Sequence, residues 1–228
     1  MHSSLYVCSH HKTGTVLLKN IFTEFCKHTK FTFKDITHNE DTDQYLNNHI
    51  LFDEHSKNSV ASKLNGIRII RHPKDVIISG AKYHCISNES WLHKKNDGVT
   101  YQEKINSFET FQEKLMFEMH HIGKHTINDM IHFSHSNVMT IKYEDLIVDV
   151  NGVYLSTIAQ HLNLNIIERK KLFEAFKTTS HVTYGRHIKN NHINNGSPSQ
   201  WVTTFNDDLN KKFDELFPNA INTLGYDK

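Results

Sequence analysis

Residues 5–28, LYVCSHHKTGTVLLKNIFTEFCKH, decide the fold class of this 228-residue chain. A short apolar run is followed by a polar loop, and the apolar side chains after the loop recur at helical spacing. These side chains are Leu17, Leu18, Ile21, Phe22 and Phe25. The order predicts a strand, a tight loop and a helix. In such a loop several backbone N–H groups point outward, and the helix dipole adds partial positive charge, so the segment is suited to bind an anion.

The loop itself, HKTGT at residues 11–15, carries the groups that such an anion needs. Gly14 permits the tight backbone that wraps an anion. Lys12 can reach an anionic oxygen, and Thr13 and Thr15 add hydroxyl donors. An ordinary strand-to-helix turn that happens to hold a lysine is the simpler alternative for this segment taken alone.

The remainder of the chain repeats the alternation of strand and helix signals. Further strands are predicted at residues 30–36, 49–53, 66–70 and 137–143, and helices at 72–84, 101–133, about 153–162, 166–177 and 206–217. Such alternation favours parallel pairing, so we expect an α/β fold with a mostly parallel central sheet flanked by helices. With 3 prolines and 9 glycines there is no candidate linker, which predicts a single domain over residues 1–228. Ligands of such sheets bind outside the carboxyl ends of the strands.

Composition excludes several function classes. The formal charge of +1, from 26 basic and 25 acidic residues, provides no global basic field for nucleic acid or an anionic membrane. No apolar run has membrane-spanning length, and the N-terminus does not read as a secretory signal. Cys8, Cys26 and Cys85 are expected to be free thiols, which favours a cytoplasmic protein. The 19 histidines are scattered; the helical spacing of His121 and His125 leaves a metal site as an alternative, but none is expected.

A second constellation lies in residues 67–84, IRIIRHPKDVIISGAKYH. Arg71 stands at a strand end, and Ser79 follows eight residues later in the next helix. The arginine offers a planar, charge-assisted clamp for a phosphate, and the serine a hydroxyl. Asp75, in the first turn of that helix, is interpreted as a cap or structural partner rather than a ligand.

Two later segments complete the pattern: YEDL at residues 143–146, and a glycine loop running from Gly196 to Trp201. A Walker A loop fits the first segment poorly, because it requires Gly-x-x-x-x-Gly-Lys-Ser/Thr and here the lysine precedes the glycine. In this order, HKTGTVL, RHPKDVIIS, YEDL and the Gly196–Trp201 loop resemble the sulfotransferases that use 3′-phosphoadenosine 5′-phosphosulfate (PAPS). The resemblance runs from about residue 5 to residue 226 and implies a P-loop-like sulfotransferase fold.

The resemblance assigns roles to individual residues. It implies that Lys12 stabilises the bridging oxygen of the leaving nucleotide, and that Arg71 and Ser79 bind the 3′-phosphate. The cofactor residues that it implies are Lys12, Thr13, Gly14, Thr15, Val16, Arg71, Ser79, Tyr143, Thr179, Arg186 and Gly196, with Tyr143 and Thr179 near the adenine. PAPS is then the donor, 3′-phosphoadenosine 5′-phosphate (PAP) the product, and no metal is required.

The chain departs from the family pattern at three places. Before the late tryptophan it has Ser199 and Gln200 instead of Gly-Asp. Leu17 stands where the family often places a tryptophan against the adenine. The late Arg-Lys-Gly phosphate clamp reads Asn194-Asn195-Gly196, so a charge-assisted contact is lost. Arg186 or Lys189, slightly upstream, could compensate.

Sulfuryl transfer to a hydroxyl or amine by in-line displacement also needs a base for the acceptor proton. The predicted base is His55, at the carboxyl end of the strand HILFD; Glu54 and His49 are the alternatives. With Lys12 and Ser79, His55 and Glu54 make up the predicted catalytic set. Residues 84–125 are expected to shape the acceptor pocket, with Trp91 as its best candidate; helically spaced apolar residues there, such as Phe108, read more readily as core.

The acceptor is expected to be a small molecule or a glycan, and its identity does not follow from the sequence, nor does the oligomeric state. Two other functions stay open at this point. A P-loop nucleotide kinase-like transferase predicts magnesium-dependent binding of ATP. A non-catalytic nucleotide-binding module predicts binding without a sulfated product.

Overall fold

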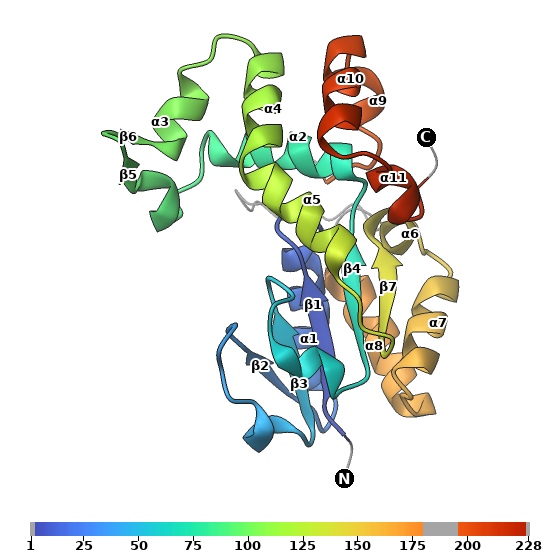
Figure 1. Ribbon diagram of the computed structural model, residues 1–228. Coiled ribbons are helices and arrows are strands. Elements are labelled where there is room, and N and C mark those ends of the chain that lie inside the picture. The colour runs from blue at the N-terminus through green and yellow to red at the C-terminus, as the bar shows by residue number, and fades with distance from the viewer. Residues whose placement is uncertain (1–2, 180–195, 227–228) are drawn as a thin grey trace. The chain divides into compact units, whose positions relative to one another are not determined.

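The computed structural model describes residues 3–179 and 196–226 (Figure 1). The chain divides into two compact units. The sheet unit comprises Met1–Arg71 and Phe133–Ile188, and the helical unit comprises His72–His132 and Lys189–Lys228. Each unit is described by itself, and the single domain over residues 1–228 stays a prediction.

The sheet unit is built on a five-stranded parallel sheet in the order β2-β3-β1-β4-β7. Its strands are β1 (Leu5–Ser9), β2 (Thr32–Asp35), β3 (His49–Asp53), β4 (Gly66–Ile70) and β7 (Val138–Lys142). All five strands were predicted, and the parallel α/β class is confirmed. Because every strand runs the same way, the five carboxyl ends meet at one edge of the sheet.

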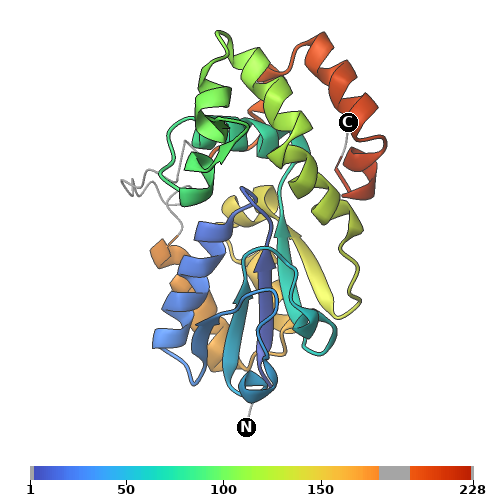
Figure 2. The ribbon, with the colours of Figure 1, turned by 60° about the vertical axis from the view of Figure 1, so that its left-hand side comes forward.

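One face of this sheet is covered by helices of the same unit. These are α1 (Thr15–Lys27), α6 (Tyr143–Ile147), α7 (Val153–His161) and α8 (Ile166–Thr179), and α1 packs against α8 (Figure 2). The predicted apolar stripe of α1 faces inward, and Phe25 is fully buried. Burying one such side chain contributes about 1.5–3 kcal/mol to the free energy of unfolding.

The opposite face of the sheet carries the alternate residues of β1 and its neighbours. Tyr6 and Cys8 are fully buried there and form a second apolar cluster with Leu51 and Val138. Two 3₁₀ turns, Asp43–Tyr45 and Ser59–Ser62, lie on the connections before and after β3. The period-two alternation of β1 therefore separates its side chains between two cores.

The helical unit begins with α2 (Pro73–His84), which Pro73 opens at the first helical position. Next come a 3₁₀ turn (Ser90–His93), the short antiparallel strands β5 (Lys95–Asn96) and β6 (Val99–Thr100), and the helices α3 (Tyr101–Asn106), α4 (Phe111–His120) and α5 (Ile122–His132). The last described part of the unit holds α9 (Trp201–Thr204), α10 (Asp207–Leu216) and α11 (Ala220–Thr223).

Two sequence expectations differ from the structure. The predicted helix over residues 101–133 is three helices, because Thr110 caps a new helix and His121 leaves helical geometry. Tyr143, expected to end a strand, opens the short helix α6.

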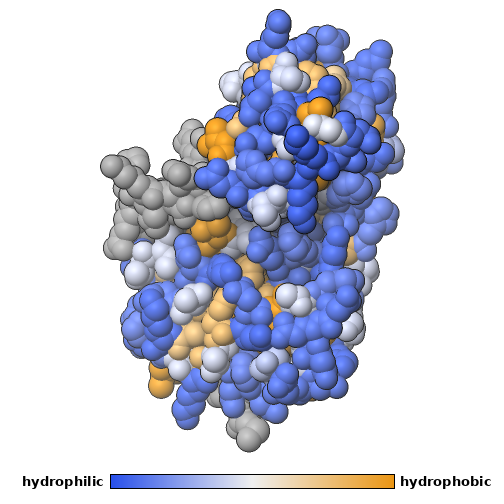
Figure 3. Space-filling view, turned by 90° about the vertical axis from the view of Figure 1, so that its left-hand side faces the viewer, coloured by the Kyte–Doolittle hydropathy of each residue, from blue (hydrophilic) through white to orange (hydrophobic). Residues whose placement is uncertain are grey.

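The face of the molecule drawn in Figure 3 is mostly hydrophilic, with apolar residues in small patches. None of the helices in residues 3–179 and 196–226 has the length and apolar character needed to cross a bilayer.

Candidate active site

The loop between β1 and α1 forms a compact turn at the carboxyl edge of the sheet. The Thr13 hydroxyl is buried, lying 2.8 Å from the His10 carbonyl oxygen and 3.1 Å from that of Ile69. The same hydroxyl accepts the His10 backbone N–H at 3.0 Å. Thr13 therefore joins the loop to β4. The sequence predicted its hydroxyl as an anion donor, but the structure uses that hydroxyl inside the protein, and the Thr13 backbone N–H donates to the His10 carbonyl at 3.1 Å. The Thr15 hydroxyl, predicted in the same role, lies 2.9 Å from the Ser9 hydroxyl.

Two positive φ angles shape the same loop. Lys12 has φ 63° and Gly14 has φ 123°. A Cβ atom on Gly14 would lie 2.9 Å from Ile69 Cδ1 and 3.1 Å from Tyr143 Cδ2, so a side chain at this position would be strained by both backbone and packing. The turn reverses the chain tightly before α1 begins at Thr15, and the start of a helix favours an anionic ligand.

Arg71 and Tyr143 adjoin this loop at the ends of β4 and β7. Both side chains are buried, and the Arg71 guanidinium lies 4.8 Å from the centre of the Tyr143 ring. The ring of Tyr143 in turn fills the space that a side chain at residue 14 would need. The structure thus brings Lys12, Thr13, Gly14, Thr15, Val16, Arg71 and Tyr143 to one edge of the sheet, as the sequence predicted. A buried cation beside the start of a helix fits a phosphate or phosphosulfate group.

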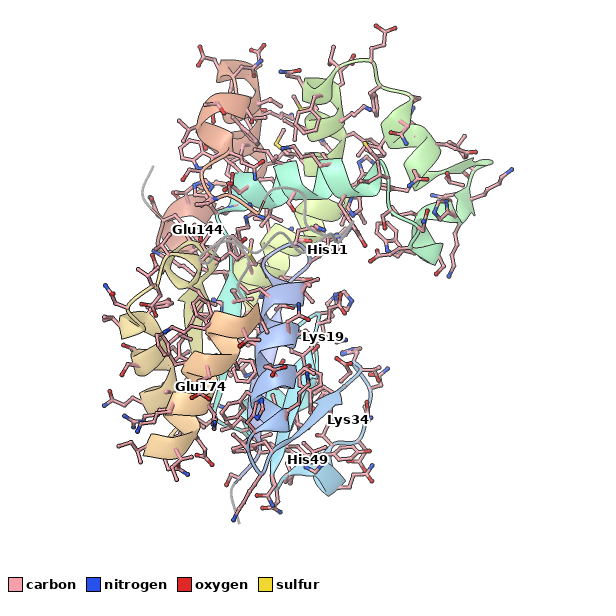
Figure 4. The ribbon with its side chains drawn as sticks, turned by 180° about the vertical axis from the view of Figure 1, so that it is seen from behind. His11, Lys19, Lys34, His49, Glu144 and Glu174 are labelled. Atoms are coloured by element: carbon pink, nitrogen blue, oxygen red, sulfur yellow. The ribbon has the colours of Figure 1, made fainter. Side chains whose placement is uncertain are left out.

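Glu54 and His55 follow β3 at the same edge, and both are exposed. The Ser56 hydroxyl donates to the Ser9 carbonyl at 2.7 Å, which ties this loop to the end of β1. His49 is the first residue of β3 and so lies at the amino edge of the sheet. Figure 4 shows His11 and His49 at opposite ends of the sheet unit. His49 is therefore excluded by position as the base, and Glu54 and His55 stay as candidates.

His10 is a buried residue of this edge that the sequence did not single out. Its ring is 2% exposed and lies edge-on to Phe133 at 6.1 Å. Among the described residues no hydrogen-bond partner reaches either ring nitrogen. Burial, and then the charge of Arg68, lowers the pKa of His10 to about 3, with smaller contributions from His55 and Lys57. His10 is therefore a neutral imidazole at physiological pH.

The helical unit holds the remaining predicted residues. Ser79 is half-buried in the middle of α2. The buried Asp75 carboxylate accepts the backbone N–H groups of Ser199 at 2.7 Å and Trp201 at 3.0 Å, so its interpretation as a structural partner is confirmed. Gly196 is buried with φ 39°, at the start of the segment that Asp75 fastens.

Three further predictions concern the adenine side and the late phosphate clamp. Thr179 is the last residue of α8, and its hydroxyl donates to the Ala175 carbonyl at 2.8 Å. Arg186 and Lys189 lie outside the described residues. Leu17, where the family often has a tryptophan, packs in the main core of the sheet unit.

The expected acceptor residues form an aromatic cluster in the helical unit. Trp91 is half-buried, donates its indole N–H to Glu89 at 2.6 Å, and packs against His84 and Tyr101. The fully buried His84 and Glu118 are joined at 2.8 Å. In the described part of the chain, no group of three or more His, Cys, Asp or Glu side chains could hold a metal ion.

Three further polar residues of the sheet unit were not predicted from the sequence: Asp53, which ends β3, and Tyr6 and Arg68, which lie inside β1 and β4. All three are buried. A buried strand that ends in aspartate was the available signal for Asp53. For Tyr6 and Arg68, which lie inside apolar runs, no local pattern marks their role.

Comparison with known proteins identifies the class to which this fold and site belong. The family model described as "Sulfotransferase domain" matches residues 3–225. The chain therefore belongs to the sulfotransferase domain family, and the resemblance read from the motifs is confirmed. No curated protein matches the sequence.

Solved structures support the same fold. Mouse sulfotransferase SULT7A1 complexed with PAP has a TM-score of 0.65 at 18% identity, covering 96% of this chain and 84% of that chain. Retinol dehydratase with androsterone and inactive cofactor PAP has a TM-score of 0.55 at 13% identity, covering 99% and 82% of the two chains. Retinol dehydratase with retinol and PAP has a TM-score of 0.56 at 15% identity, covering 100% and 84%.

These matches support sulfuryl transfer as the function of the chain. They give no support to the alternative of a nucleotide kinase or a non-catalytic nucleotide-binding module.

Proposed function

We propose that this protein transfers the sulfuryl group of PAPS to a hydroxyl or amine acceptor and releases PAP. The observation that carries the proposal is the convergence of the β1–α1 loop, Arg71 and Tyr143 at one sheet edge in a member of the sulfotransferase domain family. PAP in the related structures supports the choice of nucleotide.

The residues at this edge divide the work of binding and catalysis. The loop amides from Gly14 to Val16 hold the 5′ end of the nucleotide, since the Thr13 N–H already donates to the His10 carbonyl at 3.1 Å. Arg71 with Ser79 holds the 3′-phosphate. When bound, PAPS supplies the sulfuryl group. Lys12 places positive charge where the leaving oxygen gains negative charge, which lowers the barrier more than it strengthens ground-state binding.

A proton must leave the acceptor as the new S–O or S–N bond forms. His55 takes it in this proposal, because its position at the carboxyl end of β3 places it at the same edge as Lys12. Glu54 is the second candidate for this role. Androsterone and retinol in the retinol dehydratase complexes support a small-molecule acceptor. The three cysteines are free thiols, which supports a cytoplasmic location.

Replacing Lys12 by Ala tests the chemistry. We expect kcat for sulfuryl transfer from PAPS to fall by about 10²–10³-fold, because one pre-organised contact to the leaving oxygen is lost, while the affinity for PAP falls much less. The matched control is Lys19→Ala on α1, whose ammonium pairs with Asp35 at 2.8 Å and which should retain full turnover. Sulfated product is measured from labelled PAPS with a panel of alcohols, phenols and amines. Full turnover of Lys12→Ala would refute the proposed role of the loop.

A further inference from the structure

The buried carboxylate of Asp53, two residues before the proposed base His55, accepts several hydrogen bonds. It accepts the Tyr6 hydroxyl at 2.8 Å, the Asn58 backbone N–H at 2.7 Å and the His55 backbone N–H at 3.1 Å. Asp53 is 2% exposed and Tyr6 is fully buried. Burying a carboxylate is costly unless donors compensate it, and these three donors do so.

Tyr6 serves this cluster as a permanent donor. Burial, and then the nearby Cys8 and Asp53, raises the pKa of its hydroxyl well above the usual range. The phenol therefore stays protonated and donates to Asp53. Tyr6 lies within β1, and Asp53 ends the neighbouring β3, so the bond spans two strands of the sheet.

The loop that follows Asp53 is also held by hydrogen bonds to Ser9, at the end of β1. The Ser9 hydroxyl donates to the Glu54 carbonyl at 3.2 Å, and the Ser56 hydroxyl donates to the Ser9 carbonyl at 2.7 Å. Ser56 adopts a left-handed φ of 56°, which costs energy for a residue with a side chain. The end of β1, where the Lys12 loop starts, thus holds the short segment on which both candidate bases stand.

We propose that Asp53, buttressed by Tyr6, is the positioning residue that aims His55 at the acceptor. The inference rests on the proposed function and adds two buried residues to it. Removing the carboxylate leaves the His55 backbone without its anchor, and a displacement of about 1 Å at a reacting group can cost 10²-fold in rate.

The test is a double-mutant cycle with the acceptor that the wild type sulfates best. Asp53→Asn should lower kcat by about tenfold to a hundredfold with an unchanged KM for PAPS. In a His55→Ala background the same substitution should cost less than about twofold, because a residue that acts through His55 has nothing left to position. Tyr6→Phe should lower kcat in the same way but by a smaller factor.

Asp149→Asn is the matched control, because Asp149 is also buried in the sheet unit and accepts the Leu155 backbone N–H at 2.7 Å. It should lower Tm without lowering kcat. The positioning role would be overturned by either of two results. One is a double variant in which the kcat losses of Asp53→Asn and His55→Ala multiply, and the other is an unchanged kcat in Asp53→Asn. A wild type that transfers no sulfuryl group to any acceptor while binding PAP would instead refute the proposed function.

Discussion

At the scale of single residues, His10 makes the stability of the protein depend on pH. Its pKa is about 3 in the folded chain against 6.5 for an unperturbed histidine. Between about pH 6.5 and pH 3 His10 is therefore protonated in the unfolded chain and neutral in the folded chain. The free energy of unfolding is unaffected by this residue above pH 6.5, and it falls by up to about 1.4 kcal/mol per pH unit as the pH is lowered through this range.

Replacing His10 by Phe should remove this dependence. The aromatic contact with Phe133 can persist, and the two unpartnered ring nitrogens disappear. We expect the free energy of unfolding, measured by urea denaturation, to fall less steeply than in the wild type between about pH 6.5 and pH 4. His38→Phe is the control, because the exposed His38 lies at the surface of the same unit and should leave the slope unchanged. Parallel pH profiles for wild type and His10→Phe would contradict the assignment.

The sequence predicted where the loop and Arg71 lie, at the ends of two strands, because local order makes that visible: a strand, then lysine and glycine, then a helix. The partners of Asp53 could not be read in this way. The register that sets Cys8 beside Asp53 also brings the Tyr6 hydroxyl within reach of that carboxylate, and register depends on the whole sheet. Burial of His10 likewise depends on Phe133, far along the chain.

At the scale of elements, α2 and α4 approach closely because α2 carries a glycine. A Cβ atom on Gly80 would lie 2.6 Å from Glu118 Oε1. The Glu118 carboxylate receives the Tyr101 hydroxyl at 2.9 Å and lies 2.8 Å from His84 Nδ1. The two helices can therefore bury this polar network only if residue 80 lacks a side chain.

Gly80→Ala should destabilise the protein by about 1–3 kcal/mol, the usual cost of overpacking a closed interior. Alanine has a higher helix propensity than glycine, so helix propensity alone would predict that Gly80→Ala stabilises the protein, and we expect the opposite. Thermal unfolding measures the effect, and the Glu118→Ala background supplies the control. There the Cβ atom has room, and the penalty of Gly80→Ala should shrink or change sign. A penalty that is equal in both backgrounds would show that the carboxylate is not the obstacle.

The strands of the sheet were predicted correctly because burial gives each of them a recognisable apolar pattern. The helices over residues 101–133 were not separated, because helix capping interrupts an apolar pattern that continues through them. The five strands of the sheet are short apolar or alternating runs, and each was predicted within a few residues. The break inside residues 101–133 is set by Thr110 and Glu113, which form a capping box that opens α4. Apolar residues continue at helical spacing across this break, so periodicity alone did not reveal it.

At the scale of the whole molecule, the formal charge of +1 means that capture of an anionic nucleotide depends on local cations. We propose Arg71 as one of them: its buried guanidinium lies over the Tyr143 ring beside the loop. Such a group is already ordered before the ligand arrives, so little side-chain entropy is lost on binding. A chain without a broad basic field can bind PAP selectively in this way.

Thermal stability therefore provides a test of the proposed contact between Arg71 and the 3′-phosphate. A ligand that binds only the folded state at 100 times its Kd adds about 2.7 kcal/mol to the free energy of unfolding. For a protein of this size that is a rise in Tm of roughly 5–11 °C. At the same concentration AMP, which lacks the 3′-phosphate, should raise Tm clearly less. Arg71→Ala should remove most of the difference between the two nucleotides, whereas Arg169→Ala, on the exposed side of α8, should keep it. Equal shifts with PAP and AMP in the wild type would refute the assignment of Arg71 to the 3′-phosphate.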